Sequence, residues 1–428
     1  MKQYSYWLDT LRKSEVSSLK SEVERPPNQI DVAIVGGGYT GLAAARRLAI
    51  GGASVVVLER DRIGSGASSR NGGQVLTGLK VDASTLVAKY GETRAREFFE
   101  VGNRAIAALE SVIADEAIDC GYERTGHVCA ACKASHFDAL RREQALLARV
   151  FGHRIDLLSA AEQRSEIGSD VYHGVAIDEA SRAINPAQFV DGLAAAARRR
   201  GACLVAATAV VALRRDGRRW RVSTTGGDVD ARDVLVATDG YTGSATPALR
   251  RRLVPVGSYI IATEPLSSAD AASVLPKRRM AFDSKNFLFY FRLTPDNRLL
   301  FGGRAEFGEP STDSTRRAAA ILRRGLTHVF PALADKTIDY TWSGNVAFTR
   351  DEMPRAGKLD ELYFAGGYCG HGIAMATHLG DVIARRIAGE PIAHPMMDDG
   401  MPAIPLYSGR PWFLPAVGAY YKVMDWLT

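Results

Sequence analysis

Hydrophobic runs and glycine-rich turns alternate in the first sixty positions of the chain. The continuous apolar run Val32 to Val35 is typical of a strand that is buried on both faces in a parallel sheet. Small and apolar residues then predict a helix from Tyr39 to about Ile50, which Gly51-Gly52 ends. Ser54 to Leu58 predicts a second buried strand, so this stretch has the order strand, turn, helix, strand.

The spacing of apolar residues changes several times along the rest of the chain. Apolar positions three and four apart predict helices over residues 92–118 and 134–150, and further helices are predicted over 186–200, 312–330 and from 372 to about 389. Strands are predicted over 121–131, 202–211 and 233–240, and residues 220–225 and 228–232 form a predicted hairpin. Alternation of apolar and polar positions between 253 and 310 predicts antiparallel sheet with one apolar face.

Three glycines follow the first strand with the spacing GxGxxG: Gly36, Gly38 and Gly41. In such a turn the first glycine allows a tight bend, the second lets the backbone approach a pyrophosphate, and the third lets helix and strand pack closely. The helix N-terminus offers free N–H groups and a positive dipole end. Glu59 ends the second strand, where a carboxylate can accept hydrogen bonds from an adenosine ribose. We interpret the stretch as a dinucleotide site rather than a plain structural turn.

Two further glycine-rich segments carry candidate chemistry. Residues 62–74 follow Glu59 directly and combine glycines and small hydroxyls with Arg70 and Asn71, so we interpret them as a loop that contacts the ligand rather than a surface loop. Residues 362–372 have the order strand, glycine loop, helix, which can place a second helix N-terminus at the ligand.

Composition limits the possible partners. The chain has 428 residues, which predicts two intertwined domains, and a formal net charge of +6. Its arginine clusters lie in predicted helices without interleaved aromatic residues, so we predict solvated faces and no nucleic-acid partner; a mild preference for anionic small molecules is equally compatible. Five scattered cysteines favour a reducing compartment, and Cys129 and Cys132 are interpreted as packed thiols rather than a redox or metal site.

Targeting signals are not evident in the sequence. The N-terminus has no apolar core of a secretory signal, and no window reaches about 18 consecutive apolar residues, so we expect a cytoplasmic enzyme. Tyr4, Tyr6 and Trp7 are expected to pack the N-terminal arm onto the body. The aromatic tail, residues 404–428, is interpreted as packing onto the body rather than lying on a membrane surface.

Four segments together resemble the D-amino acid oxidase family of flavoproteins: GGGYTGLAAARRLA with VVVLE, GSGASSRNGGQ, VLVATDGYT and YFAGGYCGHGIAMATHLG. The resemblance covers about residues 28 to 390. Within that family, which includes glycine and sarcosine oxidases, the combination SRNGGQ, ATDGYT and GGYxGHG looks most like the gamma-glutamylputrescine oxidases.

The resemblance implies an α/β fold with two domains. One is a Rossmann-like FAD/NAD(P)-binding domain of the glutathione-reductase type, and the second is a substrate domain built on a large mixed antiparallel sheet. We expect an N-terminal arm over 1–28, an FAD-binding domain over 29–80, 186–250 and 345–395, a substrate domain over 81–185 and 251–344, and a tail over 396–428.

The resemblance also implies the residues that hold FAD. They are expected to be Gly36, Gly38, Tyr39, Thr40, Gly41, Glu59, Arg60, Gly66, Ala67, Ser68, Arg70, Asn71, Gly72, Gly73, Gln74, Val210, Ala237, Thr238, Gly240, Gly370, His371, Gly372 and Ile373. In sarcosine oxidases that bind flavin covalently, a cysteine lies several residues before the pair that resembles Asp351-Glu352. That region has no cysteine here, so we predict non-covalent FAD and no metal.

The implied reaction is oxidation of a small-molecule amine to an imine, which hydrolyses to a carbonyl compound, with dioxygen reoxidising the flavin to give hydrogen peroxide. Tyr259 and Tyr290 are candidates for the walls of an amine pocket, Arg304 for a carboxylate ligand, and His371 for a position beside the flavin. A tyrosine in a sheet can equally be a core residue, and an arginine at a strand end can be solvated.

Three alternatives stay open at this point. One is a flavin dehydrogenase that passes electrons to a quinone. Another is an oxidase of alpha-amino acids or opines, and the third is a flavin-binding protein without turnover. The sequence does not favour membrane association and does not reveal the oligomeric state.

Overall fold

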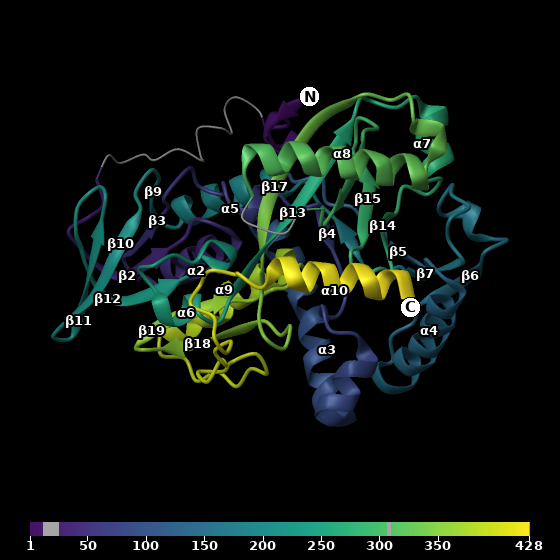
Figure 1. Ribbon diagram of the computed structural model, residues 1–428. Helices are drawn as coiled ribbons and strands as arrows, with labels where there is room; N and C mark the ends of the chain where they lie inside the picture. Colours follow the sequence, from purple (N-terminus) through teal and green to yellow (C-terminus); the bar gives the residue numbers. More distant parts are fainter. Residues whose placement is uncertain (12–24, 306–309, 428) are drawn as a thin grey trace.

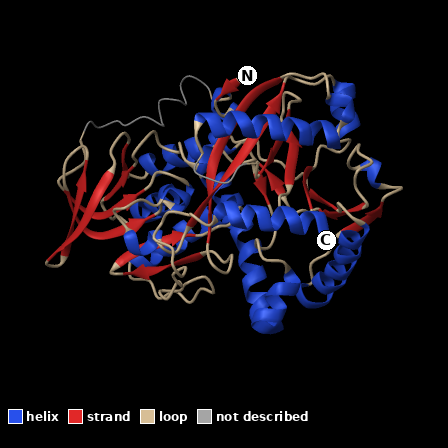
Figure 2. Ribbon diagram, viewed as in Figure 1, coloured by secondary structure: helices blue, strands red, loops and turns tan. Residues whose placement is uncertain are grey.

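Two large β-sheets and the helices packed on them make up the molecule (Figures 1 and 2). The computed structural model describes residues 1–11, 25–305 and 310–427. Within these residues the first sheet has eight strands: β2 (Gln29–Val35), β3 (Val55–Leu58), β9 (Cys203–Val205), β10 (Val210–Asp216), β11 (Arg219–Thr224), β12 (Val229–Val236), β18 (Arg355–Leu359) and β19 (Leu362–Gly366).

The first sheet is parallel at its centre, where β19, β12, β2, β3 and β9 run side by side. Helices α2 (Tyr39–Ile50), α5 (Pro186–Arg199) and α9 (Gly372–Ile387) share one hydrophobic cluster with residues of β2 and β3. A second cluster joins Trp220 and Val222 of β11 to Val56 and Leu58 of β3. Helices therefore pack against one side of the parallel strands, and residues of β11 contribute to the apolar cluster on the other side, which fits the predicted Rossmann-like domain.

The second sheet has nine strands within the described residues, in the order β1 (Lys2–Gln3), β17 (Ile338–Phe348), β13 (Val254–Thr263), β16 (Leu299–Gly303), β15 (Phe289–Leu293), β14 (Met280–Asp283), β5 (His127–Ala130), β7 (Gly174–Asp178) and β6 (Asp156–Ser159). Most of its pairs are antiparallel, but β1–β17 and β14–β5 are parallel. The prediction of a large mixed antiparallel sheet is confirmed. A small pair, β4 (Gln74–Val75) with β8 (Arg182–Ala183), is separate from both sheets.

Helix α8 (Thr312–Val329) lies across one face of the second sheet (Figure 1). Its Leu322 and Leu326 share a cluster with Tyr259, Ile261 and Phe301 of the strands. Successive strand residues point to opposite faces. In β13, Tyr259 and Ile261 therefore face α8, whereas Ser258 faces the other side of the sheet, where the cavity described below lies.

Several predicted elements differ from those in the structure. Helix α3 (Ala83–Asp115) starts nine residues earlier than predicted, because Asp82 caps it and it continues across a kink at Gly91, where φ is 74°. The predicted strand 202–211 is two strands, β9 and β10, since the backbone turns at Ala207 with φ of 51°. The strands predicted over 228–232 and 233–240 form a single strand, β12. The strand predicted over 121–131 is shorter in the structure, where it is β5.

The remaining helices are short or peripheral. They are α1 (Tyr6–Asp9), α4 (Ala134–Leu146), α6 (Pro247–Arg250), α7 (Ser268–Val274) and α10 (Leu414–Leu427). Helix α7 and strand β14 lie within 253–310, a segment for which only antiparallel strands were predicted. None of the helices in the described ranges combines the length and the apolar character needed to cross a bilayer.

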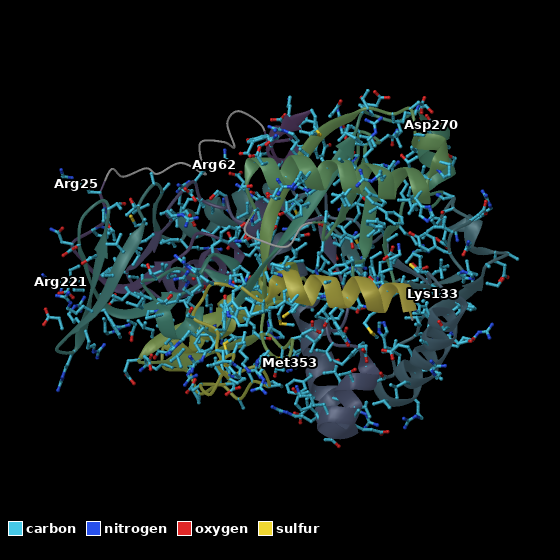
Figure 3. The ribbon with its side chains drawn as sticks, viewed as in Figure 1. Arg25, Arg62, Lys133, Arg221, Asp270 and Met353 are labelled. Carbon is cyan, nitrogen blue, oxygen red and sulfur yellow. The ribbon has the colours of Figure 1, made fainter. Side chains whose placement is uncertain are left out.

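Both ends of the described chain pack on the body. Tyr6 and Trp7 are buried as predicted, but Tyr4 is 38% exposed. The tail packs only in part, since Tyr407 and Leu414 are buried whereas Trp412, Tyr420 and Tyr421 are exposed. The Asp425 carboxylate of α10 accepts from the backbone N–H of Asn286 at 2.9 Å, and Lys133, labelled beside the end of α10 in Figure 3, donates to the Asp425 carbonyl at 2.9 Å. The division into domains predicted from the sequence stays a prediction.

Candidate active site

A cavity of about 840 Å³ is lined by residues of both sheets. This volume is at the upper end of the range for small-molecule sites. Its lining includes Glu59 and Val210 at the carboxyl end of the parallel strands, the loop of residues 65–72, and the second glycine loop at His371. We call the part lined by Leu79, Lys80, His127, Cys129, Glu143 and Asp178 the remote chamber.

The first glycine turn connects β2 to α2 at the edge of the cavity. Gly36 has φ of 109°, and a Cβ there would lie 2.7 Å from the carbonyl oxygen of Ala237. A Cβ at Gly41 would lie 2.0 Å from the carbonyl oxygen of Gly36, so only glycine lets the helix start this close to the strand. The turn therefore brings the first N–H groups of α2, which have no intrahelical partner, up to the cavity.

Glu59 follows β3 and is fixed by two backbone donors. Its carboxylate accepts from the N–H of Gly37 at 2.8 Å and from the N–H of Asp61 at 3.0 Å. Each carboxylate oxygen has further acceptor capacity. Glu59 is thus pre-oriented at the cavity beside the glycine turn, as a ribose-binding acid requires.

The loop of residues 65–74 is tied to α2 and to the second sheet. Ser68 Oγ accepts from the Tyr39 N–H at 3.0 Å, and the Tyr39 hydroxyl donates to the Ser68 carbonyl. Asn71 donates to the carbonyls of Ala67 and Ser68 and accepts from the N–H of Gly73. Both polar atoms of the Asn71 side-chain amide are therefore occupied within the loop, and these bonds hold the loop in shape.

Arg70 crosses from this loop to the second sheet. Its guanidinium donates to the carbonyls of Ser65 at 2.7 Å and Ser343 at 3.1 Å, and Trp342 Nε1 donates to the Arg70 carbonyl. Trp7 of the N-terminal arm donates in the same way to the Asn71 carbonyl at 2.9 Å. Donors from two distant segments, at Trp7 and Trp342, thus fix the backbone of this loop, and Arg70 ties the loop to Ser343.

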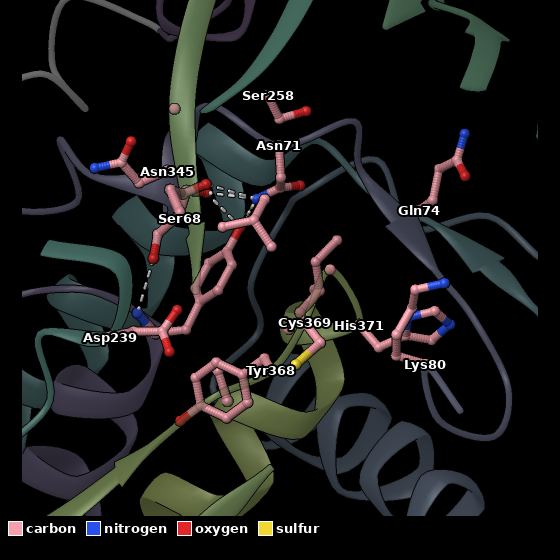
Figure 4. A pocket seen from close by; sticks show the side chains of 18 of the residues that line it. Ser68, Asn71, Gln74, Lys80, Asp239, Ser258, Asn345, Tyr368, Cys369 and His371 are labelled. Carbon is pink, nitrogen blue, oxygen red and sulfur yellow. Dashed lines mark hydrogen bonds between the residues drawn. The ribbon is translucent and has the colours of Figure 1, made fainter. Parts of the chain in front are cut away.

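The second glycine loop joins β19 to α9 and depends on Asp239. The Asp239 carboxylate accepts from the N–H of Gly367 at 2.7 Å, and burial raises the pKa of this carboxyl to about 6. Beyond it, the hydroxyls of Tyr368 and Thr40 are 2.6 Å apart, which links the loop to α2. Gly370 has φ of 98°, and a side chain there would extend into open space. Figure 4 shows Asp239, Tyr368 and Cys369 around this part of the cavity.

His371 ends this loop and lines the cavity. Burial, with smaller contributions from the charge of Lys80 and from His127, lowers its pKa to about 3, so the imidazole is neutral at working pH. Its Nδ1 is buried and has no hydrogen-bond partner within the part of the chain that the structure describes. Figure 4 shows Lys80 directly beside the ring.

Tyr290 and Arg304 form the wall on the side of the second sheet. The Tyr290 hydroxyl and Ser258 Oγ are 3.0 Å apart, and burial raises the pKa of the phenol to about 12. A Cβ at Gly302 would lie 2.3 Å from the Tyr290 ring, so this glycine makes room for it. The Arg304 guanidinium lies 4.8 Å from the centre of the Phe348 ring, and burial lowers its pKa.

The prediction that Tyr259 walls the cavity is wrong. Its side chain is fully buried under α8, and its hydroxyl lies 3.4 Å from Ser314 Oγ. The pleat of β13 is the reason, because it points Ser258 to the cavity and Tyr259 to the opposite face. Three predicted cofactor glycines, Gly41, Gly73 and Gly240, also do not line the cavity; their neighbours are the Gly36 carbonyl, the Ile184 carbonyl and Asn345, so they act through packing.

The other predicted residues line the cavity together. They are Gly36, Gly38, Tyr39, Thr40, Glu59, Arg60, Gly66, Ala67, Ser68, Arg70, Asn71, Gly72, Gln74, Val210, Ala237, Thr238, Gly370, His371, Gly372, Ile373, Tyr290 and Arg304. The structure fits FAD on three grounds: a glycine turn at a helix N-terminus, an anchored acid at the next strand, and an unsatisfied buried nitrogen at His371. Contact of each residue with FAD stays a prediction.

Comparison with known proteins decides the family. The family model DAO, FAD dependent oxidoreductase, matches residues 31–386. The chain belongs to this family. It is 36% identical over 400 residues to the gamma-glutamylputrescine oxidoreductase of Escherichia coli (strain K12), covering 92% of each chain. It is 31% identical to the probable oxidoreductase OrdL of Haemophilus influenzae, covering 98% of this chain and 97% of that one.

The fold has solved relatives. The crystal structure of glycine oxidase from Geobacillus kaustophilus superposes with a TM-score of 0.73 at 22% identity, covering 86% of this chain and 97% of that chain. The protein is therefore an FAD-dependent oxidoreductase of the DAO family with the fold expected from its sequence. Bound FAD would supply the oxidant, and the residues described above are the ones predicted to hold it.

Sequence reasoning missed several residues that line the cavity. Asp239 lies in the ATDG motif that was noted, and its position before a glycine at a strand end was the available signal. Ser258 and Asn345 come from strands of the second sheet, and no motif marks them. Lys80 lies only six residues after the glycine loop, but nothing in the sequence alone showed that its segment turns back to the cavity.

Proposed function

We propose that this enzyme oxidises a primary or secondary amine of the gamma-glutamylputrescine type to an aldehyde. For a primary amine the overall reaction consumes the amine, dioxygen and water and yields the aldehyde, ammonia and hydrogen peroxide. The observation that carries the proposal is the extension of the cavity past His371 into the remote chamber, which leaves room for a long substrate. The name of the Escherichia coli relative, at 36% identity, supports the same substrate class.

Bound FAD would supply a two-electron oxidant for the carbon–nitrogen bond. The chain's own part is to orient a neutral amine and to exclude water. His371 is neutral because its pKa lies near 3, so it adds no positive charge to this part of the cavity. Tyr290 stays a neutral phenol because its pKa lies near 12, and its hydroxyl offers a hydrogen bond at the cavity wall. Neither group is a strong base at neutral pH, so the amine must bind with its nitrogen already deprotonated.

The test is anaerobic mixing of the FAD-loaded enzyme with gamma-glutamylputrescine, followed by exposure to air. We expect the flavin absorbance to bleach without oxygen and about one peroxide to form per amine consumed in air. Bleaching without peroxide would indicate a dehydrogenase that uses another electron acceptor, such as a quinone. Absence of bleaching with this amine and with a panel of related amines would refute the proposal.

One observation favours a second candidate, oxidation of an alpha-amino acid. The guanidinium of Arg304 lies at the cavity, where its contacts are the Phe348 ring and a long 3.4 Å hydrogen bond to the Asn286 carbonyl. Such a group can hold a carboxylate beside the reacting carbon. For this candidate, Arg304→Ala should abolish flavin reduction by glycine, D-alanine or sarcosine. If the long amine reduces the flavin of the wild-type enzyme and these amino acids do not, the second candidate is refuted.

A further inference from the structure

The remote chamber contains Lys80, for which the described residues provide no hydrogen-bond or ion-pair partner. Among the charged groups that line the cavity, Arg60 pairs with Asp61, and Arg70 donates to two backbone carbonyls. Lys80 differs, because within the described residues no carboxylate, carbonyl or hydroxyl lies within hydrogen-bond distance of its Nζ. Its side chain is half-buried at the cavity. A partly desolvated ammonium without a partner costs free energy that an incoming anion would recover.

The backbone that carries Lys80 is fixed on both sides. On one side, Thr77 Oγ1 donates to the Asp178 carboxylate at 2.6 Å. On the other side, Asp82 caps α3 by accepting from the Thr85 N–H at 2.7 Å, and the Glu143 carboxylate accepts from the Ala83 N–H at 2.8 Å. The position of Lys80 is therefore set before any ligand arrives, which lowers the entropy cost of binding.

The segment that carries Lys80 also packs tightly against α3. A Cβ at Gly102 of α3 would lie 2.5 Å from the carbonyl oxygen of Gly78, so the chain before Lys80 rests directly on the helix. Lys80 itself lines the cavity, and its charge contributes to the lowered pKa of His371; Figure 4 shows both side chains in the same part of the cavity. An anion bound by Lys80 would thus lie on the chamber side of the second glycine loop.

The acids of the chamber do not neutralise Lys80. Asp178 is engaged by His153 Nε2 at 2.7 Å and by Thr77, and Glu143 is engaged by the Ala83 N–H. His127 and His371, which also line the cavity, both have lowered pKa values and are neutral. Lys80 therefore forms no ion pair with either acid in the part of the chain that the structure describes, and its ammonium is left to meet a carboxylate of the substrate.

The rest of the chamber wall is apolar. Leu76, Leu79, Leu140, Leu147, Ile155 and Phe282 line it. An apolar wall with one cation fits a polymethylene or amide-linked chain that ends in a carboxylate better than it fits a short amino acid, whose carboxylate lies next to the reacting carbon.

We propose that Lys80 binds a carboxylate at the end of the substrate remote from the reacting carbon, and that the enzyme therefore selects long amines that carry such a group. This inference rests on the proposed amine oxidation and assigns Lys80 as its specificity-determining residue. Gamma-glutamylputrescine, with its alpha-carboxylate remote from the primary amine, has this form. An otherwise identical amine without the carboxylate lacks the group that Lys80 recognises.

The test compares two probes on the FAD-loaded enzyme. They are gamma-glutamylputrescine and 4-aminobutanoylputrescine, which lacks only the carboxylate. Binding is measured by anaerobic calorimetry and turnover by peroxide release, for the wild type and for Lys80→Met, Lys80→Arg and Lys358→Met. The last is a control, because Lys358 pairs with Glu361 on the β18–β19 hairpin away from the cavity. Equal flavin content in all four proteins shows that each is folded.

We expect Lys80→Met to raise KM and Kd for gamma-glutamylputrescine about 10- to 100-fold, the range of a hydrogen bond between charged groups, with a much smaller change in kcat. The carboxylate-free probe should bind the wild type as weakly as it binds Lys80→Met, and Lys80→Arg should restore part of the affinity. Equal losses for both probes in Lys80→Met, or equal affinity of the wild type for both, would overturn the inference while the proposed function stands.

A failure of the proposed function has a different signature. If the wild type oxidises neither probe, the amine-oxidase proposal fails. Calorimetry then shows whether Lys80 still binds the carboxylate. Binding of gamma-glutamylputrescine that Lys80→Met removes still supports the carboxylate site. Absence of binding, or binding that is independent of Lys80, refutes it.

Discussion

The first glycine turn and the remote chamber are built in opposite ways. The turn is contained in one stretch of about thirty residues, and several of its contacts lie within that stretch: Gly41 lies against Gly36, and Glu59 accepts from Gly37. The chamber is assembled from segments near residues 80, 128, 143 and 177, which meet only in the folded chain. On the proposed function, the former would hold FAD, which the family shares, and the latter would face the part of the substrate that can differ between members.

This difference teaches where specificity can change without loss of the cofactor site. A change in the turn affects packing of α2 on β2 and therefore the fold of the first sheet. A change in the chamber alters side chains on a second sheet with its own hydrophobic cluster. Substitutions in the two regions should therefore separate into effects on FAD and effects on substrate.

The largest expected effect is at the turn. Gly41→Val places a Cβ 2.0 Å from the Gly36 carbonyl and adds two methyl groups, so α2 cannot start in place. We expect purified protein without flavin absorbance, even after incubation with FAD. Gly51→Ala is the matched control at the other end of the same helix, where a Cβ would lie 3.3 Å from the nearest atom. A yellow, active Gly41→Val protein would contradict the role given to this contact.

A smaller effect on FAD is expected from Glu59→Ala. The substitution removes the carboxylate that two backbone N–H groups orient toward the cavity, together with its proposed bond to the ribose. Loss of hydrogen bonds to a charged group should weaken FAD binding about 10- to 100-fold, with little change in the KM for the amine. The Kd for FAD is measured by titrating flavin-free protein with FAD. Glu97→Ala, on the exposed face of α3, is the control. An unchanged Kd for FAD would remove Glu59 from the site.

The sequence predicted the turn almost completely and the chamber hardly at all. The glycines, α2 and Glu59 follow from local spacing, because each conformation depends on residues nearby in the chain. Tyr259 was assigned to the cavity wrongly, since alternation along β13 shows that its faces differ but not which one α8 covers. Lys80 was missed for a related reason, because the contact of Gly78 with Gly102 that positions its segment joins distant parts of the chain.

Asp239 lies at the junction of the two regions and makes stability depend on pH. Its pKa is about 6 in the folded protein, against 3.8 without burial, so the folded state holds the proton more tightly than the unfolded state. This group therefore stabilises the fold fully below pH 3.8, and the contribution is lost as the pH rises to about 6. The loss corresponds to about 3 kcal/mol of unfolding free energy.

Asp239→Asn keeps an oxygen for the Gly367 N–H but removes the ionisation. In urea unfolding of flavin-free protein, we expect the variant to gain stability relative to the wild type between pH 4.5 and pH 7. Asp138→Asn on the exposed face of α4 serves as the control, and its difference from the wild type should stay the same at both pH values. A difference for Asp239→Asn that does not change with pH would show that the carboxyl titrates alike in both states.

The smallest expected effect is at the wall of the second sheet. Tyr290→Phe removes one hydroxyl and its 3.0 Å contact with Ser258, while Gly302 and Gly72 still leave room for the ring. A single neutral hydrogen bond is worth about 0.5–1.5 kcal/mol, so the KM for the amine should rise about 2- to 10-fold with unchanged affinity for FAD. Tyr363→Phe, on the hairpin of β18 and β19, should leave both values as in the wild type. If Tyr290→Phe instead lowered FAD affinity and left the KM unchanged, the wall of the second sheet would contact the cofactor rather than the amine, and the separation of the two regions would fail there.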